Sequence, residues 1–200
     1  MSTFDEKAQD WDTPERRDRA RDIADIIRTH VPLSPSMHAI DIGAGTGLLG
    51  LELAADVGSM VLAEPSDGML AVAREKLAAS GPSHVTAVPF DIEAGSPDGA
   101  PFDLAVSLLV LHHVADTRAA LQSIHDLLAP GGRIALFDLD AEDGTFHDDP
   151  EGIHHHGFDQ AALRTTAASV GFRNVETRVV SEIDRDGRMY PLFLLTAQRD

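Results

Sequence analysis

The sequence predicts a single α/β domain: a doubly wound sandwich in which helices cover both faces of a seven-stranded, mostly parallel sheet. Three observations predict it. Short apolar runs typical of strands alternate with segments typical of helices along most of the 200 residues. The central runs are apolar on both faces, as in parallel sheets that are covered on both sides. The last two runs are joined by a tight turn, which makes the final strand antiparallel.

The N-terminal segment, residues 1–36, is expected to be helical and to precede the α/β core at residues 37–200 within one domain. The helical pattern covers residues 4–28. Thr13 is a favourable N-cap and Pro14 suits the first helical position, so the pair predicts a helix start there. Two prolines shortly after residue 30 end this unit.

The body of the chain then alternates between strands and helices. The alternation predicts right-handed crossovers and a parallel sheet. We expect strands at residues 37–42, 59–63, 85–89, 102–109 and 133–139, with helices at residues 48–55, 67–79 and 116–128.

The C-terminal part follows another pattern. A helix is expected at residues 159–170, closed by Gly171. Strands at residues 175–180 and 190–196 are joined by the turn sequence at residues 184–187, Asp-Arg-Asp-Gly. These two strands bring the sheet to seven and reverse the direction of the last one.

Composition excludes several classes of function. The formal net charge of -17 disfavours nucleic acid and anionic membrane surfaces as partners, because both would be repelled. No apolar run is long enough to span a bilayer, and the N-terminus lacks the apolar core of a signal peptide. Cysteine is absent, which excludes disulfides and thiolate sites. We expect a cytoplasmic protein and leave its oligomeric state open.

A glycine-rich turn follows the first strand and opens a helix. It runs Asp41-Ile-Gly-Ala-Gly-Thr-Gly47, and such glycines let backbone amides approach a ligand closely. Residues 45–50 also satisfy the G-x-G-x-x-G fingerprint of dinucleotide enzymes, so a nicotinamide or flavin oxidoreductase is an alternative. Asp41 argues against that alternative, because a carboxylate at the mouth of the turn suits a cationic group better than a pyrophosphate.

Further candidates lie at the ends of the next two strands. Glu64 ends the second strand, where a carboxylate can accept hydrogen bonds from both ribose hydroxyls. Asp91 follows the third strand and can accept from an adenine amine, while Ile92 offers an apolar wall. Met69 can cover the other face of the ring or belong to the core.

Together these pieces resemble the class I S-adenosylmethionine-dependent methyltransferases, in particular the small-molecule branch that includes quinone-biosynthesis methyltransferases. The order and spacing of the motifs cover most of the chain beyond residue 37. The matching pieces are DIGAGTG at 41–47, LAEPSDGML at 62–70, PFDIE at 89–93, FDLAVSLLVLHHV at 102–114, LLAPGGRIALFD at 127–138 and GF at 171–172.

The resemblance implies an enzyme that uses S-adenosylmethionine as cofactor and methylates a small-molecule oxygen, carbon or nitrogen acceptor by in-line displacement. It implies that the N-terminal helices form a lid, in which Arg16 either pairs with the cofactor carboxylate or lies on the helix surface. A non-catalytic protein that binds the same cofactor is a further alternative. The residues implied at the cofactor are Asp41, Gly43, Ala44, Gly45, Thr46, Gly47, Glu64, Pro65, Met69, Asp91, Ile92 and Leu108.

Histidines are the candidates for acid–base work. His113 follows the fourth strand, and His154 and His155 lie in the loop after the fifth strand, at the edge where open α/β sheets bind ligands. We predict these three as catalytic residues. A metal site formed by His147, nearby acids and the histidine run is an alternative, and so is a solvated loop without function. No metal ligand is assigned.

Overall fold

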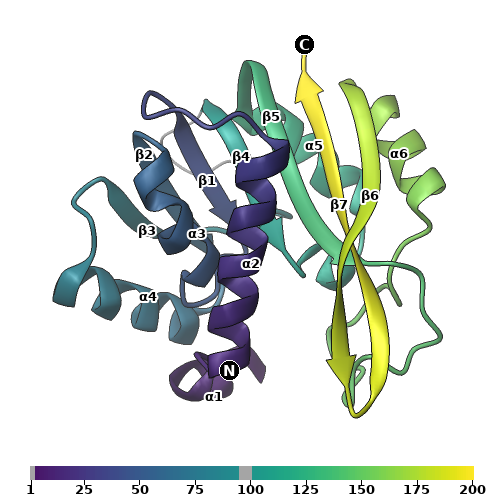
Figure 1. Cartoon of the computed structure of the whole chain (residues 1–200), viewed down its shortest axis with the longest axis horizontal. Coiled ribbons are helices and arrows are strands. Elements are labelled where there is room, and N and C mark those ends of the chain that lie inside the picture. Colours follow the sequence, from purple (N-terminus) through teal and green to yellow (C-terminus); the bar gives the residue numbers. More distant parts are fainter. Residues whose placement is uncertain (1–2, 95–100) are drawn as a thin grey trace.

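The computed structural model describes residues 3–94 and 101–200. Its single sheet has the order β3-β2-β1-β4-β5-β7-β6, and only β7 runs antiparallel to the rest (Figure 1). The predicted fold class is confirmed. The strands are β1 His38–Ile42, β2 Ser59–Glu64, β3 Val85–Pro89, β4 Phe102–Leu108, β5 Leu128–Leu139, β6 Phe172–Arg185 and β7 Arg188–Arg199.

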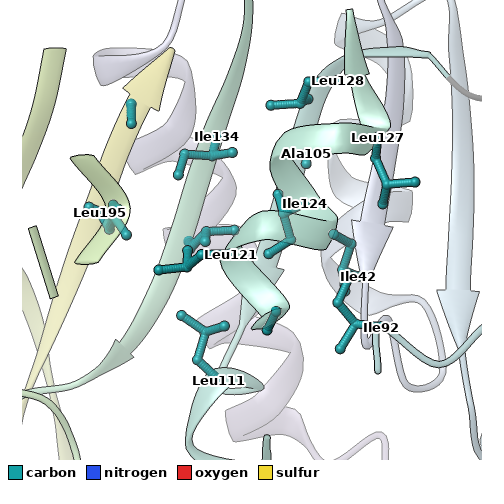
Figure 2. Packing of buried hydrophobic residues seen from close by; sticks show 14 of the residues in the cluster. Ile42, Ile92, Ala105, Leu111, Leu121, Ile124, Leu127, Leu128, Ile134 and Leu195 are labelled. Atoms are coloured by element: carbon teal, nitrogen blue, oxygen red, sulfur yellow. The ribbon is translucent and has the colours of Figure 1, made fainter. Parts of the chain in front are cut away.

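Helices cover both faces of the sheet because alternate residues of the central strands are buried on opposite sides. Ile40 and Ile42 of β1 pack on the face covered by α5 and α6, while Ala39 packs with α2 and α3. Figure 2 shows side chains of α5 lying against the central strands. The helices are α1 Thr3–Lys7, η1 Ala8–Asp10, α2 Pro14–His30, α3 Leu48–Leu53, η2 Ala54–Asp56, α4 Asp67–Ser80, η3 Leu111–His113, α5 Thr117–Leu127 and α6 Gln160–Ser169.

The N-terminal segment is divided into α1, η1 and α2 rather than forming one helix. The break comes at the predicted start signal, where the Thr13 side chain accepts a hydrogen bond from the Arg16 amide and caps α2. Ile23 and Ile27 of α2 are buried in the core, whereas α1 lies at the carboxyl edge of the sheet (Figure 1). The N-terminal segment therefore reaches from the core to the edge where ligands bind in such folds.

The C-terminal hairpin is longer than its sequence pattern indicates. The apolar runs predicted strands of six and seven residues, whereas β6 has 14 residues and β7 has 12. The additional residues are mostly polar and exposed, so they carry no apolar alternation. The turn itself is as predicted: Asp186 and Gly187 both have positive φ, as a type I′ turn requires. The tip extends past the carboxyl edge of the sheet (Figure 1).

Across residues 3–94 and 101–200, none of the helices combines the length and the apolar character needed to cross a membrane.

Candidate functional site

Neighbouring segments fix the position of the glycine turn between β1 and α3. The amides of Gly43 and Ala44 donate to the Ala63 carbonyl at 2.8 and 3.1 Å. Gly43, Gly45 and Gly47 all have positive φ, a conformation that costs glycine little. A Cβ on Gly43 would meet a Val110 methyl at 2.5 Å, so a side chain does not fit there. The loop is thereby fixed between β2 and the turn that follows β4.

Asp41 anchors the helix that follows this loop. Its Oδ2 accepts a hydrogen bond from the Gly50 amide at 2.9 Å, and its side chain is buried. Burial raises the pKa of Asp41 to about 7, and the nearby Glu64 carboxylate adds to the rise. Asp41 thus joins β1 to the first turn of α3, while a contact from Asp41 to a cationic ligand stays a prediction.

Glu64 joins the ends of β1 and β2. Its Oε2 accepts from the Gly45 amide at 2.7 Å, and its Oε1 accepts from the Ser66 amide at 2.9 Å. A carboxylate has about four acceptor positions, so two remain for hydroxyl donors. Burial raises the pKa of Glu64, while the two amides lower it. This geometry fits a carboxylate that holds a ribose diol beside the glycine loop.

The remaining predicted cofactor residues surround this centre in different ways. Asp91 is exposed and accepts from the Glu93 amide at 2.9 Å, and Ile92 beside it is buried. Met69 is almost fully buried under the start of α4, where it packs as a core residue. Pro65 is exposed and Leu108 is partly buried. We call the residues at the carboxyl ends of β1, β2 and β3 the cofactor half of the site, and Leu108 lies beside them at the end of β4.

The N-terminal segment contacts the cofactor half of the site directly. Oδ1 of Asp5 accepts from the Ser66 hydroxyl at 2.6 Å and from the Gly68 amide at 3.0 Å, at the N-terminus of α4. The Trp11 indole nitrogen lies 3.7 Å from the position of a Cβ on Gly45. These contacts place α1 and η1 directly on the glycine loop and on the end of β2.

A second set of contacts secures the same segment. The Thr46 hydroxyl donates to Oδ1 of Asp12 at 2.5 Å, and Lys76 forms an ion pair with Asp12. Lys76 also donates to the Thr46 carbonyl at 2.8 Å. Sequence reasoning selected Thr46 for the cofactor but missed Asp5, Asp12 and Lys76, because no motif links these distant positions.

A buried carboxylate–histidine pair lies at the carboxyl ends of β4 and β5. Asp138 is fully buried, and its Oδ1 lies 2.8 Å from Nδ1 of His112. The carboxylate only accepts hydrogen bonds, so Nδ1 of His112 is the donor of this bond. Asp138 also accepts from the His112 and Leu139 amides. The pair fixes the ring of His112 firmly.

Two more imidazoles pack against His112. The ring centroids of His113 and His147 lie 4.1 and 4.9 Å from that of His112. Burial, and next the charge of His112, lower the pKa of both His113 and His147 to about 4. Nδ1 of His113 donates to the Gly152 carbonyl at 2.9 Å, and Nε2 of His147 is buried with no hydrogen-bond partner among the residues that the structure describes. At neutral pH both rings are therefore uncharged hydrogen-bond acceptors.

The loop between β5 and α6 carries the other predicted histidines. The amides of His154 and His155 donate to the His112 carbonyl at 2.9 and 3.1 Å, which brings the loop onto the histidine cluster. Nε2 of His155 donates to the Val114 carbonyl at 3.0 Å, whereas the His154 side chain is exposed. His113, His154 and His155 are thus brought together by the fold.

The same loop has hydrogen bonds within itself. Oε2 of Glu142 accepts from the amides of Gly144, Thr145 and Phe146, and the Phe146 side chain is buried. Within the described residues, no group of three or more histidines and acids has an arrangement able to hold a metal ion. The hypothesis of a metal site at His147 has no ligand set there. We call the histidine cluster, this loop and the tip of the β6–β7 hairpin the acceptor half of the candidate site.

The comparisons with known proteins agree with this arrangement. A family model described as a methyltransferase domain matches residues 40–134. The ubiquinone/menaquinone biosynthesis C-methyltransferase UbiE of Shewanella oneidensis is 36% identical over 109 residues, which are 52% of this chain and 43% of the relative. The ubiquinone biosynthesis O-methyltransferase of Ruegeria pomeroyi is 38% identical over 100 residues, which are 48% of this chain and 38% of the relative. The chain thus spans less than half the length of these curated relatives.

Residues 40–134 thus match the methyltransferase-domain family, and the chain resembles S-adenosylmethionine-dependent methyltransferases over this region. Solved structures share its fold. A complex of the Haloferax volcanii Trm112 methyltransferase activator with a methyltransferase matches with a TM-score of 0.81 at 19% identity, covering 99% of this chain and 98% of that chain. Phosphoethanolamine N-methyltransferase 2 of Haemonchus contortus, in complex with S-adenosyl-L-methionine, matches with a TM-score of 0.73 at 17% identity, covering 88% and 52%.

Asp138 is the residue of the histidine cluster that sequence reasoning should have selected. It is the last residue but one of β5, as Glu64 is the last residue of β2, and acidic residues at the carboxyl ends of parallel strands lie near the ligand edge. The signal is present in the motif at residues 127–138, whose sequence pattern otherwise indicates only a helix stop followed by a strand.

Proposed function

We propose that this chain binds S-adenosylmethionine in the cofactor half and transfers its methyl group to a small-molecule acceptor held in the acceptor half. The observation that carries the proposal is the junction between Glu64 and Gly45: a buried carboxylate at the end of β2 bonded to the amide of an open glycine loop. A side chain at Gly43 has no room beside Val110, as expected for a loop that must stay bare.

The residues of the cofactor half fit this cofactor. Glu64 has acceptor capacity left for ribose hydroxyls, and Asp91 with Ile92 supplies an acid and an apolar wall for adenine. Leu108 lies at the end of β4, between the two halves. The cofactor supplies an activated methyl group when bound. The protein therefore has to align the acceptor and exclude water, which is worth about 7–11 kcal/mol in well-oriented reactions.

The acceptor half supplies the proton acceptor in this proposal. Nδ1 of His113 is held by the Gly152 carbonyl, so Nε2 carries a lone pair that can accept a proton from an acceptor hydroxyl. The His112–Asp138 pair positions His113 by ring packing. His154 and His155 border the same loop and contribute contacts to the acceptor.

The relatives and this chemistry support the acceptor class that we propose. The relatives are named for carbon and oxygen methylation in quinone biosynthesis, and an uncharged imidazole can accept a hydrogen bond from the hydroxyl of a phenol or quinol. We therefore place this chain in the small-molecule branch. The proposal includes a cytoplasmic location and no nucleic-acid substrate, in keeping with the net charge of -17.

Calorimetry with S-adenosylhomocysteine and with NADH tests the cofactor assignment. We expect S-adenosylhomocysteine to bind more tightly, because the acids at Asp41 and Glu64 would repel a pyrophosphate. Tighter binding of NADH would show that the chain is an oxidoreductase. A screen of phenols, quinols and amines with labelled donor then tests transfer, and cofactor binding without any turnover would identify a non-catalytic partner protein.

A further inference from the structure

Two arginines of α2 and one at the end of β6 come together beside the acceptor half. The Arg16 guanidinium lies over the Trp11 ring, 3.9 Å from its centroid, and donates to the Trp11 carbonyl at 3.0 Å. Arg185 lies 5.2 Å from the centroid of Phe146 and donates to its carbonyl. Arg19, one turn after Arg16, is partly buried near both of these charges.

This arrangement is unusual for a chain with 33 acidic and 16 basic residues. Elsewhere on α2, Arg17, Arg21 and Arg28 each have an aspartate within ion-pair distance. Arg19 has neither a hydrogen-bond partner nor a carboxylate at ion-pair distance within residues 3–94 and 101–200. Burial, followed by repulsion from Arg16 and Arg185, lowers the pKa of Arg19. An anion placed there would relieve this repulsion.

The arginines are linked by direct contacts to both halves of the site. On one side, the Arg16 guanidinium stacks on the Trp11 ring, and Trp11 lies against Gly45 of the glycine loop. On the other side, the Arg185 guanidinium lies over the Phe146 ring, whose centroid is 4.8 Å from that of the His147 ring. A ligand group bound by the arginines would therefore lie close to the histidine cluster.

We propose that Arg16, Arg19 and Arg185 form an oxyanion-binding site that takes a carboxylate or phosphate group of the methyl acceptor. The identity of the ligand as the acceptor rests on the proposed function. Guanidinium groups stay charged and present forked donors that match a carboxylate or phosphate. Arg185 keeps its ion pair with Asp148 at 2.6 Å, so Arg19 is the free cation of the set within the described residues. The acceptor is thus anionic at one end and hydroxylated at the other.

The other source of such a group is the methionine carboxylate of the cofactor. The two sources are separated by comparing S-adenosylhomocysteine with 5′-methylthioadenosine, which lacks the amino-acid part. If the arginines hold the cofactor, Arg19→Gln weakens S-adenosylhomocysteine at least tenfold and leaves 5′-methylthioadenosine unchanged. That result would overturn the assignment to the acceptor.

The direct test titrates benzoate and inorganic phosphate into the protein saturated with S-adenosylhomocysteine. We expect at least one of them to bind, with affinity reduced at least tenfold in Arg19→Gln and less in Arg19→Lys, which keeps the charge but loses the fork. Arg21→Gln is the matched control, because Arg21 lies on the same helix and pairs with Asp18. The control should bind as the parent protein does.

Two outcomes of the titration reject the anion site: no binding of either probe by the parent protein, or equal binding by the parent and Arg19→Gln. Thermal melts of all variants establish that they are folded. Failure of the proposed function is distinguishable, because it appears as loss of S-adenosylhomocysteine binding by the unaltered chain. Phosphate or benzoate binding by that chain, without the cofactor, is then compared between the parent and Arg19→Gln.

Discussion

The two halves of the site are built in different ways. In the cofactor half, the groups come from the glycine loop directly after β1 and from Glu64 at the end of β2, and Glu64 bonds to that loop. In the acceptor half, side chains come from separate segments: His113 after β4, His147 before α6 and Arg185 at the end of β6. The first construction is encoded locally, whereas the second exists only once the chain has folded.

The largest expected effect is on the cofactor half. Gly45→Val should abolish S-adenosylhomocysteine binding, because the side chain fills the space between the loop and Trp11. Gly187→Val is the matched control: Gly187 also has positive φ but lies at the hairpin tip, with nothing near its Cβ position. Isothermal titration of both variants with S-adenosylhomocysteine distinguishes the loss of space for the ligand from the general effect of a side chain at a positive φ. Undiminished binding by Gly45→Val would show that the loop does not hold the cofactor.

The construction of the two halves explains how far the sequence predicts the site. The glycine loop and Glu64 are predictable because each follows a strand within one short motif. The partners Asp5 and Asp12 are not, because their donors Ser66 and Thr46 lie far along the chain and hydrogen-bond geometry leaves no sequence period. The long polar ends of the hairpin escape prediction for the same reason: backbone pairing, and not side-chain alternation, extends them.

The raised pKa of Asp41 in the cofactor half predicts a pH dependence of the free energy of unfolding. Its pKa is raised from 3.8 to about 7 by burial, so the folded state binds a proton that the unfolded state has lost between these values. The free energy of unfolding therefore falls as pH rises from about 4 to 7. Asp41→Asn keeps an acceptor for the Gly50 amide and removes this fall, a difference on the order of a few kcal/mol. Chemical denaturation at several pH values measures it, and parallel curves for both proteins would contradict it.

The acceptor half should respond to different changes. His113→Ala is expected to lower turnover of a phenolic acceptor by about 10²-fold, the lower end for a lost general base, with S-adenosylhomocysteine affinity nearly unchanged. The double change His154→Ala and His155→Ala should have a smaller effect in the same direction. His30→Ala is the control, since this ring bonds its own helix at the Ile26 carbonyl. A loss of cofactor affinity in His113→Ala would show that the two halves are not separate.

Glu64→Ala should weaken S-adenosylhomocysteine by about 1–3 kcal/mol, the range for a lost charge-assisted hydrogen bond. The change also frees the Gly45 amide, so part of the loss reflects a less ordered loop. Glu64→Gln provides the control, because its amide oxygen can still accept from one backbone donor. An affinity equal to that of the parent protein would place the ribose elsewhere.

The smallest effect on cofactor affinity is expected at Asp91, at the outer edge of the cofactor half. Asp91 is exposed, and its Oδ1 already accepts from the Glu93 amide. A hydrogen bond to one neutral amine at such a solvent-exposed position contributes about 0.5–1.5 kcal/mol. Asp91→Ala should therefore weaken the binding of S-adenosylhomocysteine by less than Glu64→Ala does. Asp91→Asn retains the acceptor for the Glu93 amide and separates loop geometry from adenine recognition. If Asp91→Ala weakens binding more than Glu64→Ala, the adenine end and not the ribose fixes the cofactor, and the junction of Glu64 with Gly45 is not the centre of the cofactor half.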